Sequence, residues 1–177
     1  MRISTQNPAP TFESVWAAIQ ETNKQMQETD RRMRAMQKKL GSWANNHGSF
    51  AEEYFFNSFE DGQQTFFGEK FDEIEKNVKN IKKGAKDEYD ILLINGNSIG
   101  IIEVKFKARE GIVAQVLRKA ETLRAGYPEY KNHKIYLGLA ALSFFPGIEQ
   151  ECINEGIAII KQVGDMVVIN DGHLKVF

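Results

Sequence analysis

The sequence predicts an α/β domain with a mixed central sheet flanked by helices, preceded by a long N-terminal helix. Three observations lead to this interpretation. Apolar and small residues recur at coiled-coil spacing through residues 12–43, and two apolar strands flank an Asn-Gly turn within residues 90–106. From there to the end of the chain, segments of helical period alternate with short apolar runs. This order of elements is typical of a sheet covered by helices.

The composition excludes several classes of protein. A chain of 177 residues is long enough for one globular domain plus an appendage, and a net charge of −1 argues against a protein that is basic over its whole surface. A local basic patch remains compatible with that total. Cys152 is the sole cysteine, which excludes an intrachain disulfide and a cysteine-based zinc cluster. Without a signal peptide or a long apolar run, we expect a soluble, cytoplasmic protein with no membrane partner.

The N-terminal segment carries a regular seam. Steps of three and four residues alternate without a break along Phe12, Val15, Ile19, Thr22, Met26, Thr29, Met33, Met36, Leu40 and Trp43. This 3.5-residue repeat is typical of a coiled coil, so we predict that residues 1–46 form a helix that joins copies of the chain into a homo-oligomer. Gly41 offers a stop or bend. The alternative is an amphipathic helix folded onto its own domain.

The second predicted domain, residues 47–177, opens with the stretch SFAEEYFFNSF. It reads as a short helix with Phe55, Phe56 and Phe59 on one face, and Glu52 shares that face because it precedes them by three, four and seven residues. The lysine-rich stretch of residues 64–86 then reads as a short strand or two with loops.

The stretch DILLINGNSIGIIEVKF predicts a β-hairpin. If residues 96–97 form its loop, Asp90 lies directly opposite Glu103. If residues 95–96 form it, Glu88 takes that place and Asp90 lies on the diagonal. Either register leaves the two carboxylates on one face, because side chains alternate along a strand.

The remaining elements follow in sequence. GIVAQVLRKAETLRAGY has helical period, HKIYLGLAAL reads as a strand buried on both faces, and PGIEQECINEG reads as a helix closed by Gly156. IAIIKQ and DMVVIN predict two more strands, and HLKVF a possible final one.

Three charges stand out in the hairpin, because the other residues on both of its faces are largely apolar. Asp90, Glu103 and Lys105 share one face towards one end. Two carboxylates held this close repel each other, and a divalent cation relieves that repulsion. The pattern therefore indicates a metal site. The alternative is a Lys–Glu ion pair with Asp90 at the rim of the sheet.

These residues resemble the signature of the PD-(D/E)XK nuclease superfamily, which has a restriction-endonuclease-like fold. An Asp, a strand crossing and then Glu-x-Lys read here as Asp90 and Glu103-Val104-Lys105, and Tyr89 stands where the name of the motif has Pro. The resemblance covers the chain from about Gly48 to its end. Within the superfamily, the chain looks most like small prokaryotic members that couple an N-terminal coiled coil to such a core.

The resemblance implies roles for these residues. Asp90, Glu103 and the Val104 carbonyl would bind Mg²⁺ (or Mn²⁺), with Glu52 as a further acidic ligand, and Lys105 would activate water and stabilise charge on the phosphate. The expected activity is metal-dependent hydrolysis of phosphodiester bonds, with DNA as the expected partner and RNA not separated from it. The alternative is a catalytically inactive nuclease-fold scaffold or nucleic-acid-binding protein that oligomerises through its coiled coil.

Further candidates could contact nucleic acid. They are Lys82, Lys83 and Lys86 in the lysine-rich stretch, and Gln115 and Arg118 on the helix after Glu-x-Lys. Lysines placed in this way form salt-dependent phosphate contacts. The alternative for the lysines is a solvated loop.

Overall fold

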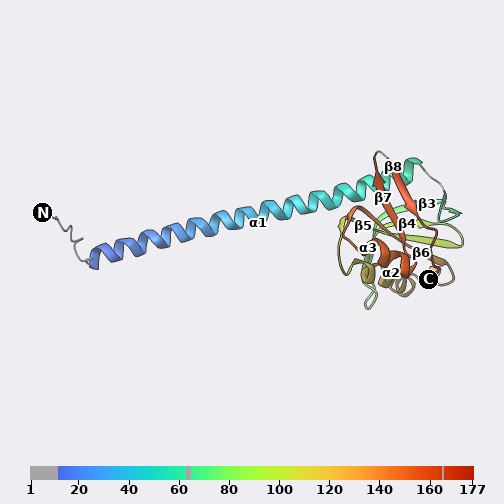
Figure 1. Cartoon of the computed structure of the whole chain (residues 1–177). Helices are drawn as coiled ribbons and strands as arrows, with labels where there is room; N and C mark the ends of the chain where they lie inside the picture. Colours follow the sequence, from blue (N-terminus) through green and yellow to red (C-terminus); the bar gives the residue numbers. More distant parts are fainter. Residues whose placement is uncertain (1–11, 63–64, 165) are drawn as a thin grey trace. The chain divides into compact units, whose positions relative to one another are not determined.

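The structure is a computed structural model that describes residues 12–62, 65–164 and 166–177 (Figure 1). It divides into two compact units, Met1–Asn45 and Asn46–Phe177. No helix among the described residues is long and apolar enough to cross a membrane.

The first unit contains the N-terminal part of helix α1, which spans Phe12–Gly62. Within it the seam residues Val15, Ile19 and Met26 are all exposed in the single chain. The side chains of the other large seam residues lie outside those that the structure describes: Phe12, Met33, Met36, Leu40 and Trp43. Self-association through this seam stays a prediction.

Of the stop or bend expected at Gly41, the stop is wrong. α1 continues through Gly41 to Gly62, so the stretch SFAEEYFFNSF is the last part of α1 and not a separate short helix. One glycine in a helix interior costs only about 1 kcal/mol relative to alanine. A cost of this size does not by itself end a helix.

The second unit is built on a six-stranded mixed sheet with the order β3-β4-β5-β6-β7-β8. Its strands are β3 (Glu73–Asn80), β4 (Asp87–Ile94), β5 (Ser98–Ala108), β6 (Lys134–Phe144), β7 (Ala158–Val163) and β8 (Met166–Asn170). β5, β6 and β7 run parallel, and the remaining neighbours are antiparallel. The other elements are the small hairpin β1 (Thr65–Phe66) and β2 (Glu69–Lys70), the helices α2 (Ile112–Gly126) and α3 (Ile148–Glu155), and the 3₁₀ turn η1 (Pro128–Tyr130). The predicted α/β architecture with a mixed sheet flanked by helices is confirmed.

Two of the predicted elements differ from the structure. The lysine-rich stretch of residues 64–86 contains three strands, and the longest, β3, pairs along β4. Residues 173–177 form no strand, although Phe177 and Ile135 exchange two backbone hydrogen bonds of 2.9 and 3.4 Å. The backbone partner of Phe177 lies far along the chain, where local pattern gives no signal, whereas β3 pairs with the next strand in sequence.

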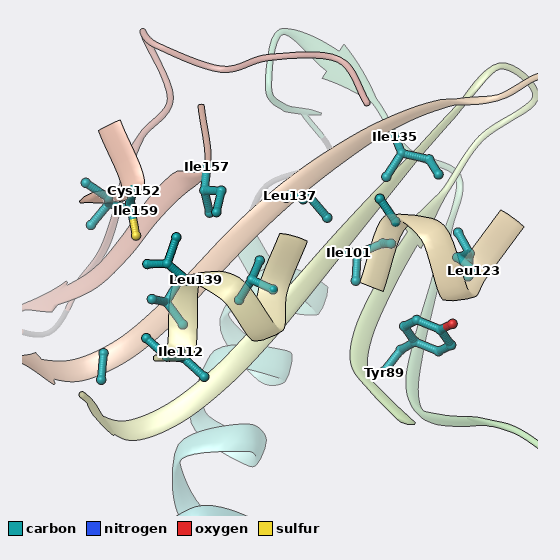
Figure 2. Packing of buried hydrophobic residues seen from close by; sticks show 14 of the residues in the cluster. Tyr89, Ile101, Ile112, Leu123, Ile135, Leu137, Leu139, Cys152, Ile157 and Ile159 are labelled. Carbon is teal, nitrogen blue, oxygen red and sulfur yellow. The ribbon is translucent and has the colours of Figure 1, made fainter. Parts of the chain in front are cut away.

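The two faces of the sheet bury separate clusters. Parallel strands need crossover connections, and α2 and α3 supply them between β5, β6 and β7. Both helices pack on the face that presents Leu92, Ile101 and Leu139, and Figure 2 shows part of this cluster. The opposite face packs against the last part of α1, including Phe55 and Phe59. The hairpin is therefore buried on both sides.

We expect Phe55→Ala to destabilise the domain by about 3–5 kcal/mol, because the fully buried ring fills the core between α1 and the sheet. Phe50→Ala is the matched control on the same helix. Its ring is 57% exposed, so its removal should change the free energy of unfolding by less than about 0.5 kcal/mol. Urea denaturation measures both. Equal effects would show that α1 does not close this core.

Candidate active site at the open end of the β4–β5 ladder

The register of the hairpin is that of the first predicted loop. Ile91 pairs with Ile102, and Asn95 donates its N–H to the Ser98 carbonyl at 3.0 Å. Extending this register by one residue places Asp90 opposite Glu103. The prediction that the two carboxylates face each other across the hairpin is confirmed at the level of the backbone.

The β4–β5 ladder ends at this point. Oδ2 of Asp90 accepts the Val104 N–H at 2.7 Å, so a side chain holds β5 where a backbone carbonyl would otherwise do so. From Tyr89 back to Asp87, β4 is paired only with β3, and from Glu103 to Ala108, β5 is paired only with β6. We call residues 87–90 of β4 and 103–108 of β5 the open ladder end.

The three predicted charged residues meet there. Nζ of Lys105 lies 2.5 Å from Oε1 of Glu103 and 3.8 Å from Oδ2 of Asp90. The Glu103 side chain is only 2% exposed and that of Asp90 13%, whereas Lys105 is 36% exposed. The two carboxylates are therefore largely buried, whereas the Lys105 side chain between them reaches solvent.

The ionised form of Asp90 is costly in this site. Burial, followed by the neighbouring Glu103 carboxylate, raises the pKa of Asp90 from 3.8 to about 6. The Val104 N–H, Lys105 and Lys119 act in the opposite direction without cancelling the rise. Removal from water is therefore the main cause of the raised pKa, and repulsion from Glu103 adds to it.

Lys119 is the functional candidate that the sequence analysis missed. This α2 lysine is 3% exposed, and its Nζ lies 2.7 Å from Oε2 of Glu103 and 3.6 Å from Oδ1 of Asp87. It also donates to the Glu88 carbonyl. Glu103 is thus held between two ammonium groups. A signal was present, because position 119 lies three residues after Val116 on the buried face of α2.

A second layer of contacts fixes this arrangement. The Thr122 hydroxyl donates to Oδ2 of Asp87 at 2.7 Å and accepts from the Tyr89 hydroxyl at 3.1 Å. Charges of alternating sign then run from Asp87 through Lys119, Glu103 and Lys105 to Asp90. The network links the start of β4 to α2 and to the open ladder end.

Glu52 lies in the last part of α1. It is partly buried, and burial raises the pKa of its carboxyl, with Lys105, Glu88 and Glu103 as the charges that act on it. It makes no hydrogen bond or ion pair within the part of the chain that the structure describes. Among the described residues, no three His, Cys, Asp or Glu side chains gather closely enough to hold a metal. The role of Glu52 as a metal ligand stays a prediction.

The remaining donor set nevertheless fits a hard cation. Mg²⁺ is commonly bound through one or two protein carboxylates together with water and substrate phosphates, and Asp90 and Glu103 supply two. Oε2 of Glu103 is buried and has no well-aligned hydrogen bond, because the contact with Lys119 is close but poorly directed. Val104 follows Glu103 on β5 and donates its N–H to Asp90, and its carbonyl remains a predicted third ligand.

The predicted nucleic-acid contacts fall at two places. The exposed Lys82, Lys83 and Lys86 lie in the loop that leads into β4, next to Asp87. Gln115 and Arg118 are exposed on α2. A guanidinium nitrogen of Arg118 lies 4.0 Å from Oδ2 of Asp87, beside the charge network. The binding roles of all five residues stay predictions.

Comparison with known families adds one assignment. A family model described as a domain of unknown function (DUF8196) matches residues 65–169. The chain belongs to this family. The matched segment starts at β1 and ends within β8, so it contains Asp90, Glu103, Lys105 and Lys119. Glu52 and the rest of α1 lie outside the DUF8196 match.

Among solved structures, the crystal structure of a repair endonuclease from Pyrococcus abyssi is similar to this chain, with 26% sequence identity and a TM-score of 0.46. The similarity covers 63% of this chain and 46% of that chain, so this DUF8196 member spans less than half the length of the endonuclease. A search of curated proteins found no match.

We expect Asp90→Asn to stabilise the metal-free protein at pH 7.5. The pKa of Asp90 in the folded chain is raised from 3.8 to about 6, so its ionisation opposes folding. The penalty is absent below about pH 4 and complete above about pH 6, where it reaches about 3 kcal/mol. Asparagine keeps an oxygen for the Val104 N–H.

Urea denaturation in EDTA at pH 4 and pH 7.5 measures the difference between this variant and the wild type. This difference in free energy of unfolding should be near zero at pH 4, and at pH 7.5 the variant should be the more stable protein. A difference that is the same at both pH values would contradict the strain between Asp90 and Glu103.

We expect Lys119→Met to destabilise the protein by about 3–5 kcal/mol, because it leaves Glu103 and Asp87 buried without their shared cation. Adding Glu103→Gln to this variant should recover part of the loss. Arg118→Gln is the control one residue earlier and should have an effect below about 1 kcal/mol, because the Arg118 side chain is 61% exposed and lies 4.0 Å from Asp87. Thermal or urea unfolding of the four proteins measures these effects. A loss from Arg118→Gln as large as that from Lys119→Met would show that burial of the cation is not its cause.

Proposed function

We propose that this chain is a metal-dependent nuclease of the restriction-endonuclease-like class that hydrolyses phosphodiester bonds in nucleic acid, with DNA as the expected substrate. The observation that carries the proposal is the meeting of Asp90, Glu103 and Lys105 at the open ladder end. Two strained carboxylates and a partly exposed lysine are the groups that this hydrolysis requires.

In this proposal, Asp90 and Glu103 hold a Mg²⁺ or Mn²⁺ ion. Bound there, the ion would lower the pKa of water and offset charge on the phosphoryl oxygens. The Val104 N–H fixes the orientation of the Asp90 carboxylate by its hydrogen bond of 2.7 Å. Lys119 fixes Glu103 from the side opposite to Lys105.

Lys105 has a different role from Lys119. In the metal-free protein, it neutralises Glu103 and Asp90. A cation that took its place between the carboxylates would free the ammonium group to contact the phosphate. Its partial exposure supports this movement, because the side chain is already open to solvent. Lys119 is enclosed and stays with Glu103.

The N-terminal helix completes the proposal. The exposed seam residues Val15, Ile19 and Met26 present an apolar row in the N-terminal part of α1. A second copy of the same helix would cover that row, so we propose that the chain acts as a homo-oligomer through a coiled coil in α1.

The alternative function is a scaffold or nucleic-acid-binding protein that keeps this fold without turnover. One observation favours it. Both oxygens of Glu103 lie against lysines in the metal-free protein, at 2.5 and 2.7 Å. If neither lysine yields to a cation, the network is purely structural.

We expect wild-type protein to cut supercoiled plasmid or single-stranded DNA when Mg²⁺ or Mn²⁺ is added, and to stop when EDTA is added. Asp90→Asn and Lys105→Met should each lower the rate by about a hundredfold or more, because each removes one group of the reacting site. Lys134→Gln is the control, since this lysine pairs with Glu69 outside the charge network and should leave the rate unchanged.

An RNA substrate belongs in the same assay, because the metal chemistry does not distinguish the two. Equal cutting by the wild type and both variants would place the activity elsewhere. The scaffold is the correct function if no substrate is cut and titration calorimetry detects no Mn²⁺ binding that depends on Asp90.

A further inference from the structure

β5 carries positive charge onward from the proposed site. Side chains alternate along a strand, so Lys107 lies on the same face as Glu103 and Lys105, about 6.6 Å beyond Lys105. Arg109 follows directly after the strand ends at Ala108. Both cationic side chains are exposed.

One aromatic ring holds both cations. Nζ of Lys107 lies 4.6 Å from the centre of the Phe145 ring, and the guanidinium carbon of Arg109 lies 5.4 Å from it. Phe145 is itself fixed, because its N–H donates to the Ala108 carbonyl at 3.0 Å and its side chain packs on the core beneath α2. Contacts of this kind restrict two flexible side chains to one place.

The two cations are also uncompensated. No carboxylate of a described residue lies within ion-pair distance of Lys107 or Arg109. Elsewhere in the domain, Lys161 lies 5.7 Å from the centre of the Phe144 ring and pairs with Glu149 at 2.8 Å. In contrast to Lys161, the two cations over the Phe145 ring therefore carry positive charge that no carboxylate of a described residue pairs with.

The acids of the opposite arm, on β4, are already paired. Asp87 lies 3.6 Å from Lys119 and 4.0 Å from Arg118, and Glu88 lies 3.4 Å from Lys79. A polyanion that reaches Asp90 and Glu103 therefore meets positive charge on the β5 arm that no carboxylate of a described residue has neutralised. This attraction favours a path for the backbone of the polyanion along β5.

We infer that Lys107 and Arg109, held by Phe145, form a phosphate-binding pair that contacts the backbone of a nucleic acid next to the bond at Asp90 and Glu103. The inference rests on the proposed function and adds the path of the substrate to it. Contacts to phosphate position a strand without reading its sequence. The pair therefore supplies affinity and register, and Lys105 remains the group at the reacting phosphate.

The test measures binding apart from cleavage. Full-length protein carrying Asp90→Asn is titrated, in EDTA, into fluorescein-labelled single-stranded and duplex oligonucleotides, and fluorescence anisotropy gives Kd at several salt concentrations. Lys107→Gln with Arg109→Gln should weaken binding about tenfold at 0.1 M salt. The slope of log K against log salt should become shallower by about 1.4–1.8, because two phosphate contacts are lost.

Two further variants separate the pair from general charge. Phe145→Leu keeps an apolar side chain on the core but removes the ring, so it should weaken binding with the salt slope largely retained. Lys161→Gln also removes a cation that lies over a phenylalanine, but this cation is already neutralised by Glu149. It should leave Kd unchanged.

The outcomes distinguish this inference from the proposed function. Unchanged Kd in the Lys107→Gln and Arg109→Gln variant, or an equal loss in Lys161→Gln, overturns the inference even if the wild type cuts DNA. Absence of any nucleic-acid binding by the parent protein overturns it as well. If the Lys107→Gln and Arg109→Gln variant loses affinity as expected while the wild-type protein cuts no substrate, the phosphate-binding pair is supported and the nuclease is refuted. The chain is then a nucleic-acid-binding protein.

Discussion

The burial of two carboxylates opposite each other in an apolar hairpin is the constraint on which the rest of this domain depends. Ionised groups are costly to remove from water unless they are paired. Asp90 and Glu103 are largely withdrawn from solvent, and the pKa of Asp90 is raised to about 6 as a result. Lys105 and Lys119 make this arrangement tolerable by approaching Glu103 from two directions.

This electrostatic requirement is tied to the topology. α2 is the crossover between the parallel strands β5 and β6, so it must lie on the face of the sheet to which Glu103 points. Its buried side brings Lys119 onto Glu103, and Thr122 onto Asp87. The same helix that allows β5 and β6 to run parallel therefore supplies the counter-charge of the site. The DUF8196 match spans all of these elements.

The ending of the β4–β5 ladder gives the site its access. If the two strands had stayed paired beyond Asp90, a backbone carbonyl would have taken the Val104 N–H and the carboxylates would have been enclosed. Instead the Asp90 side chain takes that N–H, and β5 continues with β6 towards Lys107. The acids of the β4 arm are paired with lysine and arginine side chains, whereas Lys107 and Arg109 at the end of β5 have no carboxylate partner among the described residues. The buried charge network therefore opens towards unpaired positive charge on β5.

The sequence by itself determined the features that depend on local periods. The alternation of side chains and the Asn-Gly turn placed Asp90 and Glu103 on one face, and the structure selected the first of the two registers. Helical period and strand length gave the α/β class with its mixed sheet. These inferences held because a period of 2 or 3.6 residues fixes which side chains share a face whatever the rest of the chain does.

The tertiary structure decided what depends on contacts between distant segments. Phe177 exchanges backbone hydrogen bonds with Ile135, and the last part of α1 packs against one face of the sheet. Lys119 could be placed on a buried helix face from its spacing, but its contact with Glu103 required the crossover to set α2 over the sheet. The ion pair of Lys105 likewise arises from the packed site, because the free energy of a buried charge is set by the groups that surround it in space.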